Sequence, residues 1–254
     1  MTLFYLKLIV TPLLMWAISL ASRRWGGLLG GLLSGLPITS ALVMTFLCLE
    51  QGTAFALGAV PGALGGLAAV QATYTFYLFA TRRLGIGPAV LLAMLFYGVA
   101  AYAFTHGGNL YLSIAMALVL IGVLIHASGR EPRPDALARP RQRFWEIPLR
   151  MVSATSLLMV ITSLANWLGP AASGMLAPIP VIAWPLVVFA HVQNGRAGMA
   201  AMVRGNAIGA VGVIAFYLVL AGLLDAWGVA IAISLAMLFA VILTVGLAAA
   251  LRRG

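Results

Sequence analysis

Residues 35–52 read GLPITSALVMTFLCLEQG, and residues 178–195 read PIPVIAWPLVVFAHVQNG. Laid one over the other without a gap, the two stretches place Pro37 on Pro180, and both end in glycine. Proline removes a backbone donor and glycine permits unusual backbone angles, so matches of these residues report on shared backbone geometry. The two stretches therefore predict a duplicated structural unit that repeats after 143 residues.

The same shift matches much of the rest of the chain. The pentapeptide LAMLF stands at residues 92–96 and again at residues 235–239. Further matched pairs are Gly26 and Gly169, Gly31 and Gly174, Phe46 and Phe189, Gly62 and Gly205, Gly66 and Gly209, Tyr74 and Tyr217, and Gly85 and Gly228. An internal repeat determines the architecture, so the later predictions start from two related halves.

The composition is typical of a membrane protein. Of the 254 residues, 63% are hydrophobic and 8% are charged, whereas a soluble domain carries about a quarter charged residues. Apolar stretches of about 20 residues, the length that crosses a bilayer, follow one another with short polar breaks. They predict an all-α polytopic membrane protein with about nine transmembrane helices, near 3–21, 26–49, 54–80, 85–105, 110–127, 147–165, 169–191, 197–223 and 228–250.

The charges sort to the two sides of these spans. One side collects Arg23, Arg24, Arg82, Arg83, Arg196, Arg252, Arg253 and the arginines of the proline-rich segment 128–146. The other side collects Glu50, the turn 106–109, Asn166 and Asp225, with Lys7 as an exception. Basic short loops mark the cytoplasm, which predicts a multi-pass protein of the bacterial inner membrane with its N-terminus outside and its C-terminus inside.

This sorting also explains the formal net charge of +10 without a nucleic-acid partner. Glu50 is expected at the outer interface, where a carboxylate costs little. Neither Glu50 nor Asp225 is predicted to lie in the middle of the membrane, so the sequence gives little support for proton coupling through a carboxylate.

Each half holds four spans, and a fifth span joins them. Residues 1–105 form the first repeat, residues 106–146 the joining helix and basic cytoplasmic loop, and residues 147–254 the second repeat. Because five crossings precede it, the second repeat starts on the opposite side of the membrane. We therefore expect a 4+1+4 arrangement of inverted repeats with broken helices two and seven, which is characteristic of secondary transporters.

The two quoted stretches resemble the GlpM family of small four-span bacterial membrane proteins. The features that carry the resemblance are a Gly/Pro-rich entry, a proline within an apolar helix, and an acidic or polar turn that ends in glycine fifteen residues after that proline. The resemblance implies a duplicated, fused GlpM-like unit, although Gln193 replaces the acidic Glu50 in the second half. It implies the four-span unit more than any particular activity.

Spans two and seven contain the predicted site. Pro37 and Pro180 lie roughly at mid-bilayer, and Gly35 and Pro178 precede them by two positions. A broken helix there would direct the positive ends of two helix dipoles toward a central site. Paired interruptions favour a transport site, and a simple proline kink that eases helix packing is the alternative.

Other polar residues complete this predicted substrate-binding set. They are Thr39 and Ser40 after the first break, Trp184 after the second, Gln71 in span three, and Arg204 and Asn206 in span eight. Gln71 and Asn206 need partners at that depth, and hydrogen bonding between helices is an alternative role for both. Arg204 could pair with an anionic substrate or extend to the cytoplasmic surface.

Together these features predict a secondary transporter or facilitator of a small polar or anionic substrate. The alternative is a non-transporting scaffold or regulator of envelope-polymer synthesis that acts through segment 128–146. A transporter needs a polar cavity at the middle of the membrane, whereas a scaffold can be packed solid. Membrane lipids and an unidentified small molecule are the expected partners, a homodimer is compatible with the sequence, and no enzymatic activity, cofactor or metal is predicted.

Overall fold

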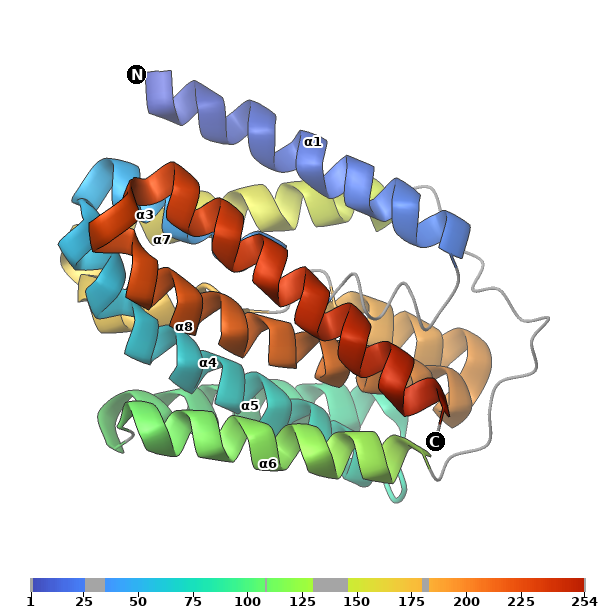
Figure 1. The fold of residues 1–254 in the computed structure, drawn as a ribbon. Coiled ribbons are helices and arrows are strands. Elements are labelled where there is room, and N and C mark those ends of the chain that lie inside the picture. Colours follow the sequence, from blue (N-terminus) through green and yellow to red (C-terminus); the bar gives the residue numbers. More distant parts are fainter. Residues whose placement is uncertain (1, 26–34, 108, 130–145, 180–182, 254) are drawn as a thin grey trace.

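The computed structural model describes residues 2–25, 35–107, 109–129, 146–179 and 183–253. Within these ranges every regular element is an α-helix. The helices in Figure 1 are α1 (Thr2–Trp25), α3 (Ile38–Gln51), α4 (Thr53–Ala80), α5 (Ile86–Gly107), α6 (Leu110–Gly129), α7 (Glu146–Leu176) and α8 (Ala183–Arg253). Five of these described helices are long and apolar enough to cross a membrane. The all-α fold with several candidate transmembrane helices is thus confirmed, and the count of nine spans stays a prediction.

Glycines divide the two longest helices into straight parts. Gly169 (φ 75°) interrupts α7, and Gly195 (φ 63°) and Gly228 (φ 71°) interrupt α8. Gly52 (φ 88°) separates α3 from α4 in the same way. Residues with a side chain rarely adopt a positive φ, which explains why glycine stands at each of these turns. In Figure 1 the orange and red parts of α8 accordingly run as separate rods.

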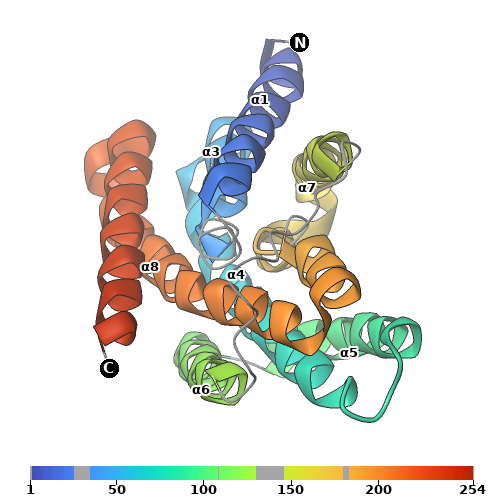
Figure 2. The same ribbon diagram turned by 90° about the vertical axis from the view of Figure 1, so that its right-hand side faces the viewer.

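Helix α4 lies in the middle of the bundle, and the other helices surround it (Figure 2). It packs against α3, α5, α6, α7 and α8, and most of its residues are buried. Gly62 and Gly66 of α4 lie directly against the backbone of Ala171 and Met175, in the part of α7 beyond Gly169. Small residues allow helix backbones to approach this closely, so the centre of the bundle is held by contacts between backbones.

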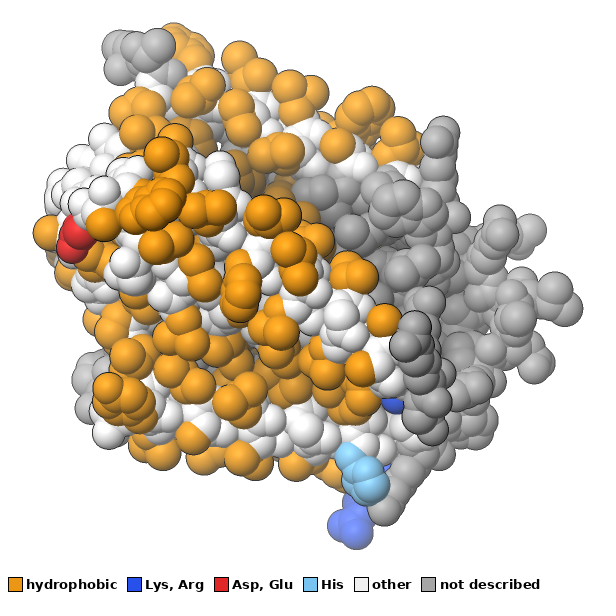
Figure 3. Space-filling model, viewed as in Figure 1, with side chains coloured by type: hydrophobic (Ala, Val, Ile, Leu, Met, Phe, Trp, Pro, Cys, Tyr) orange, Lys and Arg blue, Asp and Glu red, His pale blue; other side chains and the backbone are white. Residues whose placement is uncertain are grey.

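Hydrophobic side chains cover the face of the bundle shown in Figure 3. Acidic atoms show at one end of this face, and Lys, Arg and His atoms show at the other. Leu95 of α5 is 68% exposed, and Val119 of α6 is 61% exposed. Soluble proteins rarely expose apolar surface on this scale, so this face is suited to contact with membrane lipid rather than with water.

Candidate functional site

A cavity lies where the starts of α3 and α8 meet the middle of α4. Its volume is about 40 Å³. On this measure one water molecule needs on the order of 10–15 Å³, so the cavity has room for a few waters or one small solute. The residues that line it are Gly35, Leu36, Thr39, Ser40, Leu67, Val70, Gln71, Pro178, Ile179, Ala183, Asn206, Ala210 and Val213.

Helix ends lie beside this cavity. Helix α7 ends at Leu176, whose carbonyl accepts a hydrogen bond of 3.2 Å from the Ile179 amide in the following turn. Helix α3 begins after Pro37, with no hydrogen bond from a side-chain cap, and α8 begins at Ala183. The first turn of a helix leaves amide N–H groups without an intrahelical partner and carries the positive end of the dipole. Two helix starts therefore place partial positive charge beside the cavity.

Gln71 is the most unusual residue of the cavity wall. Its side chain is 0% exposed, and neither amide atom has a hydrogen-bond partner among the residues that the structure describes. An unsatisfied buried polar group costs about 1–3 kcal/mol. Ser40 and Asn206 are also buried and line the same space. The wall thus offers amide and hydroxyl groups that a bound polar solute can satisfy.

The structure brings together six of the residues predicted for a site. These six cavity-lining residues are Gly35, Thr39, Ser40, Gln71, Pro178 and Asn206. They come from the predicted spans two, three, seven and eight, so the cavity draws on both halves of the chain. Four of the six lie at or beside a helix end, whereas Gln71 and Asn206 lie inside α4 and α8.

The other four predicted residues lie elsewhere. Pro37 is buried at the start of α3, outside the cavity lining. Trp184 follows the lining residue Ala183 and packs on aromatic rings of α4. Arg204 does not line the cavity; its guanidinium lies beside Gly129 at the end of α6. Pro180 lies outside the described residues.

Aromatic side chains pack together between the C-terminal part of α4 and the start of α8. The Trp184 ring centroid lies 5.6 Å from that of Tyr74 and 5.2 Å from that of Tyr77. The Tyr77 hydroxyl and His191 Nδ1 share a hydrogen bond of 2.9 Å. These residues lie on α4 and on the first part of α8, so the rings and the hydrogen bond join the two helices.

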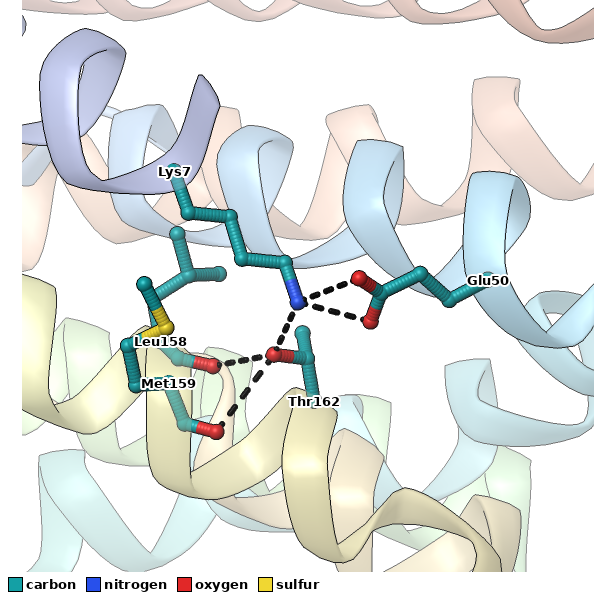
Figure 4. Close-up of polar contacts among 5 residues, drawn as sticks. All are labelled: Lys7, Glu50, Leu158, Met159 and Thr162. Carbon is teal, nitrogen blue, oxygen red and sulfur yellow. Dashed lines mark hydrogen bonds and ion pairs between the residues drawn. The ribbon is translucent and has the colours of Figure 1, made fainter. Parts of the chain in front are cut away.

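A buried ion pair that the sequence did not predict joins α1, α3 and α7 (Figure 4). Lys7 Nζ lies 2.5 Å from Glu50 Oε1 and 2.7 Å from Oε2, and it donates to Thr162 Oγ1 at 2.6 Å. Lys7 is 4% exposed, and the Glu50 side chain is 21% exposed. Glu50 is therefore partly enclosed and is held by a partner charge, which its expected place at the outer interface did not include. The one signal in the sequence was Lys7, a cation on the side that otherwise carries acidic and neutral groups.

Replacing Gln71 with methionine is expected to stabilise the folded protein. Methionine has a similar length and has no amide left without a partner, so the free energy of unfolding should rise by about 1 kcal/mol. Thermal unfolding of both proteins in the same detergent measures the change. Gln51→Met, at the partly exposed end of α3, is the matched control and should change stability little. A clear loss of stability for Gln71→Met would show that the amide is needed by the fold rather than by a ligand.

Among the described residues, no three His, Cys, Asp or Glu side chains lie together as the ligands of a metal ion would. No family model, curated protein or solved structure matches the chain. The resemblance to the GlpM family and the expected absence of metals and cofactors therefore stay predictions. The function has to be argued from the cavity and the residues around it.

Proposed function

We propose that this chain is a secondary transporter or facilitator that passes a small polar or anionic solute across the bacterial inner membrane through the central cavity. The observation that carries the proposal is Gln71, a fully buried amide without a partner among the described residues, in a cavity beside two helix starts. A polar solute in the cavity would give both amide atoms of Gln71 the hydrogen-bond partners that the described residues do not provide.

The cavity wall supports the class of substrate. Hydroxyls of Thr39 and Ser40 and amides of Gln71 and Asn206 line it, and none of the lining residues carries a full charge. Amide donors and the positive ends of helix dipoles favour acceptor-rich or anionic groups. The volume of about 40 Å³ favours solutes the size of a few water molecules.

Two observations, one of backbone angles and one of helix contacts, support the inverted 4+1+4 arrangement of nine spans. Gly52 and Gly195 correspond under the shift of 143 residues, and both have positive φ, 88° and 63°. Gly66 and Gly209 also correspond, and each lies against the interrupted segment of the other half. A Cβ atom on Gly209 would lie 2.6 Å from Gly35 Cα. In each half, the helix that carries this glycine therefore packs against the interrupted segment of the other half. A two-fold relation between the halves requires such reciprocal contacts.

The scaffold alternative depends on the basic segment 128–146, and residues 130–145 of it lie outside the described part of the chain. A scaffold has no need for a polar cavity between interrupted helices, or for a buried amide without a partner in its wall. The site therefore favours transport over this alternative.

A thermal-stability screen of the purified protein tests the proposal first. The panel contains small anions, amino acids, sugar phosphates and lipid phosphates. A ligand that binds only the folded state stabilises it by about 2.7 kcal/mol at a hundredfold excess over its Kd. We expect stabilisation by one of the smallest polar or anionic solutes, lost in Asn206→Leu and kept in Arg204→Gln, because Arg204 does not line the cavity.

The solute found in the screen is then followed in proteoliposomes by exchange of its radiolabelled form. Wild-type protein should exchange it across the bilayer, and Asn206→Leu should not. Binding without exchange, or stabilisation that survives Asn206→Leu, would contradict transport through this cavity.

A further inference from the structure

The Lys7 ammonium is surrounded by three oxygen atoms. It donates hydrogen bonds to Glu50 Oε2 and Thr162 Oγ1, and Glu50 Oε1 is its ion-pair contact. The Thr162 hydroxyl donates its own proton to the Leu158 carbonyl at 2.8 Å, so its oxygen is free to accept. The Phe46 ring lies 5.4 Å from the ammonium and adds a cation–π contact. This arrangement is satisfied only when Glu50 is ionised, because a protonated carboxyl turns one acceptor into a donor.

Three helices depend on this one carboxylate. Lys7 lies on α1, Glu50 lies at the end of α3, and Thr162 lies on α7 before the break at Gly169. Helix α3 has 14 residues, and Glu50 near its end lies about 15 Å along the helix from Thr39 and Ser40 in the first turn, which line the cavity. A change in what holds Glu50 therefore acts on a rigid helix whose other end forms the wall of the cavity.

We propose that Glu50 is a proton-binding site that couples the movement of protons to transport, an inference that rests on the proposed function. The Glu50 carboxylate is 21% exposed, at the end of the bundle opposite Arg82 and Arg196, and so water on that side can supply the proton. The proton binds a carboxylate oxygen, Lys7 keeps its own proton, and the ion pair is lost. Helix α3 is then released from α1 and α7, and loss of the proton restores the pair.

Among the groups around Glu50, its own carboxylate is the one that we expect to bind the proton. Among the described residues, Lys7 faces it from α1, and the uncharged Thr162 completes the cluster from α7. Cys48 is the titratable neighbour on α3 itself, and it is buried. Under the shift of 143 residues, the position of Glu50 is occupied by Gln193 in the second half. An amide does not bind a proton in the way a carboxylate does, so we expect one coupling proton per cycle rather than two.

Cys48 provides a native reporter for the release of α3. It is the single cysteine of the chain, it is 6% exposed, and it precedes Glu50 by two residues on the same helix. The full-length protein is reconstituted in vesicles of phosphatidylethanolamine and phosphatidylglycerol, and the rate of Cys48 labelling by N-ethylmaleimide is measured. Wild type and Glu50→Gln are compared at each pH as the ratio of their labelling rates.

Glutamine keeps an oxygen for Lys7 and lacks the charge, so it mimics protonated Glu50. At neutral pH, Glu50→Gln is expected to label about tenfold faster than wild type, and the ratio should fall toward one on acidification. Asp225→Asn changes an exposed acid and should label as wild type does at every pH. Glu50→Asp retains a titratable group and should keep the pH dependence. A ratio near one at neutral pH, or one that does not change with pH, would overturn the proposal.

The labelling needs no substrate, so it separates this proposal from the proposed function. If pH-dependent labelling occurs while the screen and the exchange assay find no solute, transport is contradicted and Glu50 remains the proton-binding site. If a solute is exchanged, an imposed proton gradient should drive its accumulation in wild type and in Asp225→Asn but not in Glu50→Gln. Accumulation by Glu50→Gln would overturn coupling through Glu50 and leave transport standing.

Circular dichroism melting of each variant identifies any labelling that arises from global unfolding. The Lys7→Met/Glu50→Gln double variant then replaces a single variant that does not fold.

Discussion

Leucine in place of Gly62 is expected to prevent the chain from reaching its folded state. A Cβ atom at this position would overlap the carbonyl of Ala171, which belongs to the backbone of another helix. A flexible side chain could rotate away from such a contact, but a helix backbone cannot. Overpacking a well-packed core costs about 1–3 kcal/mol and occasionally more, and we expect at least the upper end here because two helices must separate.

The same argument applies from the other side of this contact. Gly174 of α7 lies against the backbone of Ala59, so Gly174→Leu should be as damaging as Gly62→Leu. Gly98 of α5 and Gly122 of α6 have nothing within 4 Å of the corresponding Cβ position, and leucine there is the matched control. The yield of monodisperse protein in detergent and its thermal unfolding measure all four variants. Normal yield of Gly62→Leu would show that α4 and α7 are not in backbone contact.

Much of the central architecture could be predicted because backbone chemistry is visible in the sequence. Pro37 has no amide donor, and the structure begins α3 immediately after it. The turn at Gly195 falls between predicted spans seven and eight, where the chain must reverse. A glycine or proline acts locally on its own backbone, so its effect does not depend on which helix lies beside it.

The cavity could be predicted in part for a related reason. Gln71 and Asn206 are polar residues deep in apolar stretches, and that contrast is a local property of the sequence. The structure adds that both line one cavity and that Gln71 has no partner among the described residues. Arg204 shows the limit of the argument, because depth along a helix does not say which way a long side chain extends. Its position beside Gly129 depends on the packing of α6 against α8.

The cluster of Lys7, Glu50 and Thr162 could not be predicted from local patterns. Its members are separated by 43 and 155 positions along the chain, and each one alone has an ordinary explanation. Lys7 lies in the first two turns of α1, and Glu50 lies at the end of α3, where charged residues commonly reach an interface. Helix α1 packs against α7, and α7 packs against α3, which brings the three residues together. Burial of a charge is a tertiary property, so it required the structure.

Replacing Lys7 with alanine is expected to destabilise the folded protein by about 3–5 kcal/mol, because it leaves a partly buried carboxylate without its partner charge. The change removes the ion pair at 2.5 Å and the hydrogen bond to Thr162 at 2.6 Å, which connect α1 to the rest of the bundle near its N-terminal end. The free energy of unfolding is measured in detergent by denaturant titration of wild type and variant. We expect the midpoint to fall while the protein still assembles at low temperature.

Two double variants separate the loss of charge balance from the loss of side-chain volume. Lys7→Met/Glu50→Gln removes both charges and keeps most of the volume, and replacing a buried pair in this way is often close to neutral. Lys7→Glu/Glu50→Lys exchanges the charges and should recover part of the loss, although Thr162 can then no longer accept from an ammonium at the original position. A single Lys7→Ala variant as stable as wild type would mean that water already solvates Glu50. In that case protonation would release nothing, because a solvated carboxylate does not hold α3 against α1 and α7.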